Sequence, residues 1–131
     1  MSKARQKGTA FETLIVNYLK KKGYPHAERR AMTGAQDKGD ISFDRRFVLE
    51  CKDHKTLNLS GWLKEALTES LNAGAEFPVV VAKRRGYGDP GDQYVVMDLR
   101  TFIDLYDRIT THHALDPGIA LSYVDKASNE E

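Results

Sequence analysis

The sequence predicts an α/β domain in which a mixed β-sheet is flanked by helices. Amphipathic helical patterns alternate with short strand-like runs along the 131 residues. A predicted helix at residues 60–73 separates the strand-like run 46–53 from the apolar run 77–83. A crossover of this length allows those two strands to be parallel, whereas a tight turn joins the strands before them. The length suits one domain with one core.

The first predicted helix covers residues 9–22. Its apolar residues fall on one helical face: Phe11, Leu14, Ile15, Tyr18 and Leu19. Glu12 lies on the border of this face. Gly23 follows the helix as a natural stop, and residues 25–31 can form a short first strand. A loop rich in turn residues extends to residue 40.

Two strands, residues 40–44 and 46–53, are then expected as a hairpin with a tight turn at residues 44–46. Ser60 is the expected N-cap of the helix at residues 60–73. The apolar positions of that helix form a stripe: Trp62, Leu63, Ala66, Leu67 and Leu71. A buried strand at 77–83, a strand at 93–99 and a helix at 100–109 follow. We expect one domain over residues 1–109 and a weakly ordered or interface-forming tail over 110–131.

Composition and charge exclude several classes of protein. No apolar stretch approaches the roughly 20 residues that span a bilayer, and no secretory signal is recognisable, so no membrane partner is expected. The single cysteine, Cys51, excludes an internal disulfide and a cysteine-based zinc cluster. The expected location is intracellular and cytoplasmic, in a host cell if a phage encodes the chain. Residues 1–30 hold eight Lys and Arg against two acids, whereas the remainder holds twelve against seventeen, which permits a polyanion-binding face.

The stretch "GDISFDRRFVLECKDHK", residues 39–55, carries the candidate chemistry. Period two places Glu50 and Lys52 on one face of a strand, about 6.5–7 Å apart. Asp40 opens the neighbouring strand, so pairing can bring its carboxylate beside Glu50. An exposed surface ion pair between Glu50 and Lys52 is the alternative interpretation. Asp37 and Asp44 are the nearest competitors for the role of Asp40.

Two adjacent carboxylates repel each other unless a cation lies between them. Hard oxygen ligands without a thiolate or histidine cluster favour Mg²⁺, with Mn²⁺ as a substitute. Such a site suits phosphodiester hydrolysis, in which Lys52 can steady a hydroxide or the charge that develops on the phosphate. Glu12, on the border of the first helix, is the candidate third carboxylate.

The pattern "GTAFE…GD…VLECK", followed by a helix and "PVVVAKRRG", resembles the PD-(D/E)xK nuclease superfamily. Within it, the chain is most similar to Holliday junction resolvases of the archaeal type and their phage relatives, over roughly residues 5–108. The family motifs fall on Lys7, Glu12, Asp40, Glu50 and Lys52, and Gly39 stands where proline is frequent. The resemblance implies a restriction-endonuclease-like fold, Mg²⁺ dependence and metal binding by the backbone carbonyl of Cys51. The thiol of Cys51 is expected to point to the core.

The resemblance further implies a homodimer that resolves four-way DNA junctions in recombination and repair by paired nicking, leaving 5′-phosphate ends. Two alternatives stay open at this point. One is a repair or restriction-type nuclease acting on other branched or duplex DNA, and the other is a catalytically silent DNA-binding module.

Eight basic residues are candidates for contact with DNA phosphates. They lie near the N-terminus, before the expected hairpin and after the buried strand: Lys3, Arg5, Lys7, Arg29, Arg30, Lys83, Arg84 and Arg85. A solvated helix face or strand end is the alternative explanation for each group.

Overall fold

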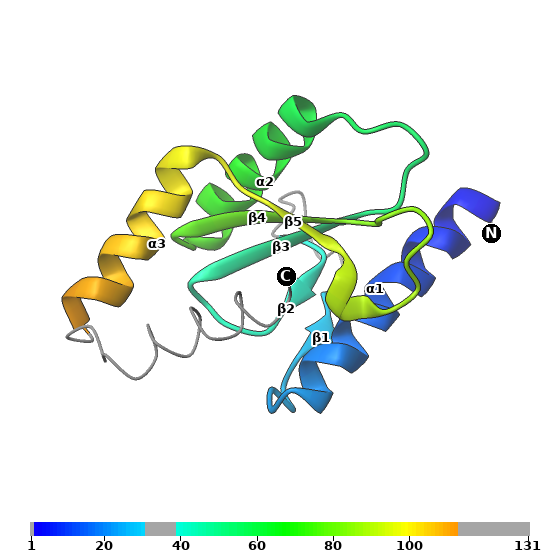
Figure 1. Cartoon of the computed structure of the whole chain (residues 1–131), viewed down its shortest axis with the longest axis horizontal. Helices are drawn as coiled ribbons and strands as arrows, with labels where there is room; N and C mark the ends of the chain where they lie inside the picture. The colour runs from blue at the N-terminus through cyan, green and yellow to red at the C-terminus, as the bar shows by residue number, and fades with distance from the viewer. Residues whose placement is uncertain (1, 31–38, 113–131) are drawn as a thin grey trace, which may run out of the picture. The chain divides into compact units, whose positions relative to one another are not determined.

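The computed structural model describes residues 2–30 and 39–112. They belong to two compact units that divide after Asp98. The first unit holds helices α1 (Lys3–Lys21) and α2 (Leu59–Ala73) together with a five-stranded sheet (Figure 1). The described part of the second unit is helix α3 (Leu99–His112). The predicted boundary between residues 109 and 110 stays a prediction.

The sheet has the strand order β1-β2-β3-β4-β5. Its strands are β1 (Glu28–Arg29), β2 (Ile41–Ser42), β3 (Phe47–Lys52), β4 (Phe77–Ala82) and β5 (Tyr94–Val96). The pairs β1–β2, β2–β3 and β4–β5 are antiparallel, and β3–β4 is parallel. Helix α2 makes the crossover between the two parallel strands. The predicted mixed α/β architecture is therefore confirmed.

Helices α1 and α2 pack on opposite faces of this sheet. Phe11 and Ile15 of α1 share one core cluster with Leu49 and Val81, whereas Trp62 of α2 belongs to another. The second cluster also holds Ala66, Val80 and Ala82. Because side chains alternate along a strand, Glu50 and Lys52 lie on the face that α2 covers, opposite Leu49.

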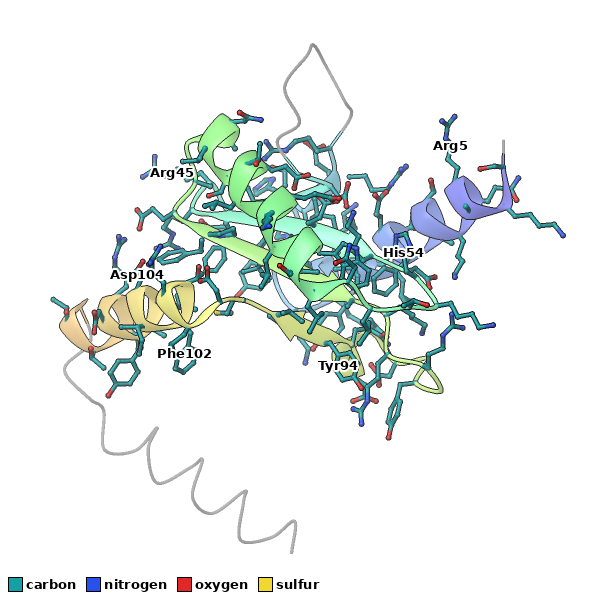
Figure 2. All side chains as sticks on the ribbon, turned by 90° about the horizontal axis from the view of Figure 1, so that it is seen from above. Arg5, Arg45, His54, Tyr94, Phe102 and Asp104 are labelled. Atoms are coloured by element: carbon teal, nitrogen blue, oxygen red, sulfur yellow. The ribbon has the colours of Figure 1, made fainter. Side chains whose placement is uncertain are left out.

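Helix α1 begins earlier than the apolar stripe predicts. Ser2 caps it by accepting a hydrogen bond from the backbone N–H of Arg5 at 3.2 Å. Lys3, Arg5 and Lys7 therefore lie in the first two turns of α1, before the predicted start of this helix at residue 9. Figure 2 shows Arg5 extending away from the helix. Residues three or four positions apart lie on the same side of a helix, so Lys3 and Lys7 share one side of α1.

Helix α2 differs from its prediction at its start and on its surface. Asn58, not Ser60, is the N-cap, and its side chain accepts from the N–H of Gly61 at 3.2 Å. Leu67 and Leu71 are 51% and 75% exposed. The buried side is instead formed by four residues at helical spacing: Trp62, Ala66, Glu69 and Ser70. The helix is rotated relative to the predicted stripe, and this rotation turns a glutamate toward the sheet.

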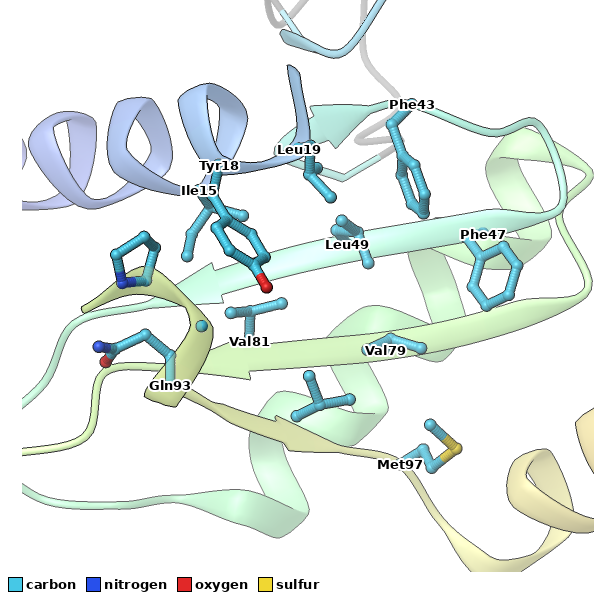
Figure 3. Close-up of a pocket in the computed structure, with 13 residues that line it drawn as sticks. Ile15, Tyr18, Leu19, Phe43, Phe47, Leu49, Val79, Val81, Gln93 and Met97 are labelled. Carbon is cyan, nitrogen blue, oxygen red and sulfur yellow. The ribbon is translucent and has the colours of Figure 1, made fainter. Parts of the chain in front are cut away.

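An apolar groove of about 380 Å³ lies on the α1 side of the sheet (Figure 3). Tyr18 of α1, Phe47 of β3 and Met97 lie around it. Since Glu50 points to the other face, the groove is separate from the charged residues of β3. Among the described helices, none combines the length and the hydropathy that spanning a bilayer requires.

Candidate functional site

Asp40 lies beside the middle of β3. Its backbone N–H donates to the carbonyl of Leu49 at 3.0 Å, and its Oδ2 accepts from the N–H of Cys51 at 2.8 Å. Gly39 precedes it with φ +95°, and a Cβ there would lie 2.8 Å from Cγ1 of Val48. Only glycine fits this close, left-handed position without strain. The hairpin thus brings Asp40 to β3 as predicted.

Glu50 is buried next to Asp40, at 5% exposure. Burial, followed by contact with Glu69, raises the pKa of Glu50 to about 9. Burial, followed by the charge of Glu50, raises the pKa of Asp40 to about 8. The two side chains share a hydrogen bond, which requires a proton on one of them. A cation is the other way to hold two carboxyl groups together.

Lys52 supplies one positive charge to this group. Its Nζ lies 3.5 Å from Oε1 of Glu50 and 2.6 Å from Oε2 of Glu65. Burial acts to lower the pKa of Lys52, but the hydrogen bond to Glu65 and the charge of Glu50 outweigh it, and the pKa is raised. Lys52 is therefore an ammonium at neutral pH, and the predicted proximity of Glu50 and Lys52 is confirmed.

Glu65 and Glu69 join the site from α2, and the sequence prediction missed both. Carboxylate oxygens of Glu50, Glu65 and Glu69 lie within 4.8 Å of one another. The helical spacing of Trp62 and Ala66 could have indicated Glu69, because position 69 continues the side of the helix that these two residues bury. The predicted apolar stripe included Leu67 instead, which does not belong to that buried side.

Glu12 lies near the site but already has a cationic partner. Its Oε2 is 2.9 Å from Nε of Arg29. Its charge contributes weakly to the raised pKa of Asp40, so it acts on the site electrostatically. Metal binding by Glu12 stays a prediction.

Cys51 packs its side chain against the core cluster on the α1 face, as predicted. Burial, followed by the charge of Asp40, raises the pKa of its thiol. The neutral thiol therefore serves as core packing, because a metal would need the thiolate. The assignment of its backbone carbonyl as a metal ligand stays a prediction.

The candidate DNA-binding residues have different surroundings. Lys3, Arg5 and Arg85 are exposed. Four others contact the protein: Lys7 pairs with Asp53 at 3.3 Å, Arg29 with Glu12, Lys83 Nζ donates to the Tyr87 carbonyl at 2.6 Å, and Arg84 stacks on the Tyr87 ring at 3.6 Å. The backbone N–H of Arg30 donates to the carbonyl of Asp40 at 2.8 Å. The structure does not gather all eight into one described contact network.

Asp44 and Asp37 are the two acidic residues that compete with Asp40, and the structure describes only Asp44. Asp44 accepts from the backbone and the guanidinium of Arg46, which holds the hairpin turn. That role removes it from competition with Asp40. Asp37 lies outside the described residues.

The donor set fits a hard divalent cation. Oε2 of Glu50 is buried without a hydrogen-bond partner, and the neighbouring donors are carboxylate oxygens. Such oxygen atoms are the ligands that Mg²⁺ and Mn²⁺ prefer. No family model, curated protein or solved structure matches the chain.

Proposed function

We propose that this protein is a Mg²⁺-dependent endodeoxyribonuclease that cleaves branched DNA by phosphodiester hydrolysis. The observation that carries the proposal is the buried Glu50, with Lys52 on the same strand face and Asp40 beside it. A surface ion pair does not explain a glutamate whose side chain is 7% exposed and interacts with a second carboxyl group. The order α1, three antiparallel strands, α2 and a parallel β4 supports the restriction-endonuclease-like fold that the resemblance implies.

Each residue has a role in this proposal. Asp40, Glu50 and the carbonyl of Cys51 would hold Mg²⁺, with Mn²⁺ as the substitute. The bound metal would polarise a phosphoryl oxygen and lower the pKa of a water molecule. Lys52 places its ammonium where negative charge develops on the phosphate. Its contacts with Glu50 and Glu65 keep it charged and hold its position.

Glu12 would complete the metal ligands only after Arg29 leaves it. A DNA phosphate offers Arg29 an alternative anion, since guanidinium groups bind phosphate in the same bidentate manner as carboxylate. DNA binding would then release Glu12 toward the site. This role agrees with the placement of Arg29 at the start of the sheet, one strand away from Asp40.

Branched DNA is the proposed substrate and a homodimer the proposed assembly. A two-fold dimer would present two active sites to a junction of matching symmetry, so that opposing strands are nicked in pairs. The exposed cations Lys3, Arg5 and Arg85 are available for phosphate contacts, which would make binding depend strongly on salt.

A comparison of two substrates tests this function. A synthetic four-way junction and a linear duplex of matched sequence are incubated with the protein in Mg²⁺. We expect paired nicks with 5′-phosphate ends in the junction and little cleavage of the duplex. Equal cleavage of both would favour the repair or restriction-type nuclease. Junction binding without nicking in either Mg²⁺ or Mn²⁺ would favour the silent DNA-binding module.

A further inference from the structure

The loop between β4 and β5 starts beside the candidate site and is held by its own hydrogen bonds. The backbone N–H of Lys83 donates to the carbonyl of Lys52 at 2.8 Å, so the loop leaves the sheet next to the end of β3. Gln93 closes the loop: its Oε1 accepts from the N–H of Arg84 at 2.7 Å, and its Nε2 donates to the carbonyl of Tyr87 at 2.9 Å. These bonds define the shape of the loop before any ligand binds.

Two half-exposed tyrosines flank a guanidinium group on this loop. Cζ of Arg84 lies 3.6 Å from the centre of the Tyr87 ring and 5.5 Å from the centre of the Tyr94 ring. Tyr87 and Tyr94 are nevertheless 43% and 45% exposed, so both keep surface that a ligand can cover. Among the described residues, no carboxylate lies within ion-pair distance of Arg84. The group therefore combines two aromatic surfaces with a cation that no acid neutralises.

Tyr94 points to the same face of the sheet as Lys52. Ala82 of β4 is the register partner of both residues, so the three form one row across β3, β4 and β5. Two strand spacings separate the Cα atoms of Lys52 and Tyr94 by about 10 Å. Each nucleotide of a stacked strand advances about 3.4 Å, so a DNA strand with a phosphate at Lys52 reaches Tyr94 within about three nucleotides.

This combination of side chains suits an unpaired base. Proteins hold single-stranded nucleic acid by stacking bases on aromatic rings and placing cations along the phosphates. A base inside a duplex has both faces covered by its neighbours and offers no face to a tyrosine. Lys83 and Arg85 flank Arg84 in the sequence and add positive charge at the start of the loop, whereas its acids, Asp89 and Asp92, lie toward the other end.

We propose that Arg84, Tyr87 and Tyr94 form a stacking site for an unpaired base of the DNA strand that is cut. This inference rests on the proposed function and deepens it, because branched DNA supplies such bases where the stack of base pairs is interrupted. A purely structural role, in which the two rings only hold Arg84 in place, is the alternative. Single exposed aromatic residues are common on protein surfaces, so the test must separate the two roles.

The test compares two single-stranded probes that carry the same number of phosphates. One is a short fluorescein-labelled oligothymidylate, and the other is an abasic chain of the same length. Binding is measured by fluorescence anisotropy in EDTA, so that no cleavage occurs. We expect the wild type to bind the oligothymidylate at least about fivefold more tightly than the abasic chain. Tyr87→Ala and Tyr94→Ala should each reduce this preference to about twofold or less.

Equal affinity of the wild type for both probes, or an unchanged preference in both alanine variants, would overturn the proposal. Tyr106→Ala removes an exposed tyrosine on α3 and should keep the wild-type preference. Tyr87→Phe and Tyr94→Phe keep the rings and should keep it as well, and its loss in both would contradict stacking. If Tyr94→Ala fails to fold, Tyr87→Ala carries the test, since Gln93 and Lys83 bind the backbone carbonyl of Tyr87 and not its side chain.

The inference and the proposed function can fail separately. A protein that prefers the oligothymidylate but nicks no DNA in Mg²⁺ would remove the nuclease function and leave the stacking site standing. A protein that nicks junctions but binds both probes equally would remove the stacking site alone. In a protein that does both, Tyr94→Ala should raise the protein concentration for half-maximal nicking of a four-way junction by at least about fivefold. An unchanged concentration would contradict the placement of the base next to Lys52.

Discussion

Replacing Glu50 by glutamine should change how the stability of the metal-free protein depends on pH. Glu50 has a pKa of about 9 in the folded protein against an ordinary value of 4.5. Between these values the folded state keeps a proton that the unfolded chain has released. The contribution of this proton to the free energy of unfolding is therefore fully present below about pH 4.5 and is lost as the pH rises toward 9. Asp40, with a pKa of about 8, acts in the same direction.

The size of the effect follows from the width of this window. One carboxyl group that titrates only in the unfolded state changes the free energy of unfolding by about 1.4 kcal/mol per pH unit. Between pH 6 and pH 8, Glu50 alone should remove roughly 2–3 kcal/mol. In a domain of this size such a loss lowers Tm by about 10 °C. Glutamine has the shape of the protonated acid and does not ionise, so this part of the slope should vanish in the variant.

Thermal unfolding in EDTA, followed by circular dichroism from pH 5 to pH 9, measures both slopes. Wild type should lose stability steadily across this range, and Glu50→Gln should be more stable than wild type at pH 8. Glu28→Gln is the control, because this residue is exposed on β1 and its variant should follow the wild-type profile. A flat wild-type profile, or the same slope in Glu50→Gln, would refute the buried and protonated state of Glu50.

Three further predictions concern the hairpin and the cation. Gly39→Ala should lower the free energy of unfolding, measured in urea, by about 2 kcal/mol or more, because the backbone φ is +95° and the added Cβ would lie 2.8 Å from Cγ1 of Val48. Gly88→Ala is the control, because a Cβ there would meet no atom within 4 Å. Equal stability of both variants would contradict the steric argument. Asp44→Ala should cost about 1 kcal/mol at pH 7 through the lost bonds to Arg46. Because Arg46 lowers the pKa of Asp44 to about 2, this contribution should be present above about pH 4 and lost as the pH falls toward 2; a cost that persists at pH 2 would argue against it. Mg²⁺ at 10 mM should raise Tm more at pH 8 than at pH 6, since the ion replaces protons on the carboxyl groups; equal shifts would contradict that exchange.

The hairpin part of the site could be predicted from the sequence because its geometry is local. Strand alternation places Glu50 and Lys52 on one face, and a short turn fixes which residues oppose them. Asp40 therefore reaches β3 as its position along the chain indicates. The pairing of Glu12 with Arg29 was not predicted, because it depends on how α1 lies against β1.

The contribution of α2 could not be predicted by the same reasoning. Glu65 and Glu69 are close to Glu50 only because of the rotation of α2 over the sheet, which depends on packing by Trp62 and Ala66. Glutamate within a helix usually indicates a solvated face, and the apolar pattern favours Leu67 as the core residue. In the structure Leu67 is half exposed and Glu69 is buried. The early start of α1 depends on Ser2, a cap that precedes any apolar pattern.

The most direct test of the nuclease site is single-turnover nicking of a labelled four-way junction in Mg²⁺ by wild type, Asp40→Asn, Glu50→Gln and Lys52→Met. Asp104→Asn, an exposed carboxylate on α3, serves as the matched control. We predict that wild type and Asp104→Asn nick the junction, and that the three site variants bind it with similar affinity but nick it at least a hundredfold more slowly. Nicking at the wild-type rate by Glu50→Gln or Lys52→Met would contradict the assignment of the active site.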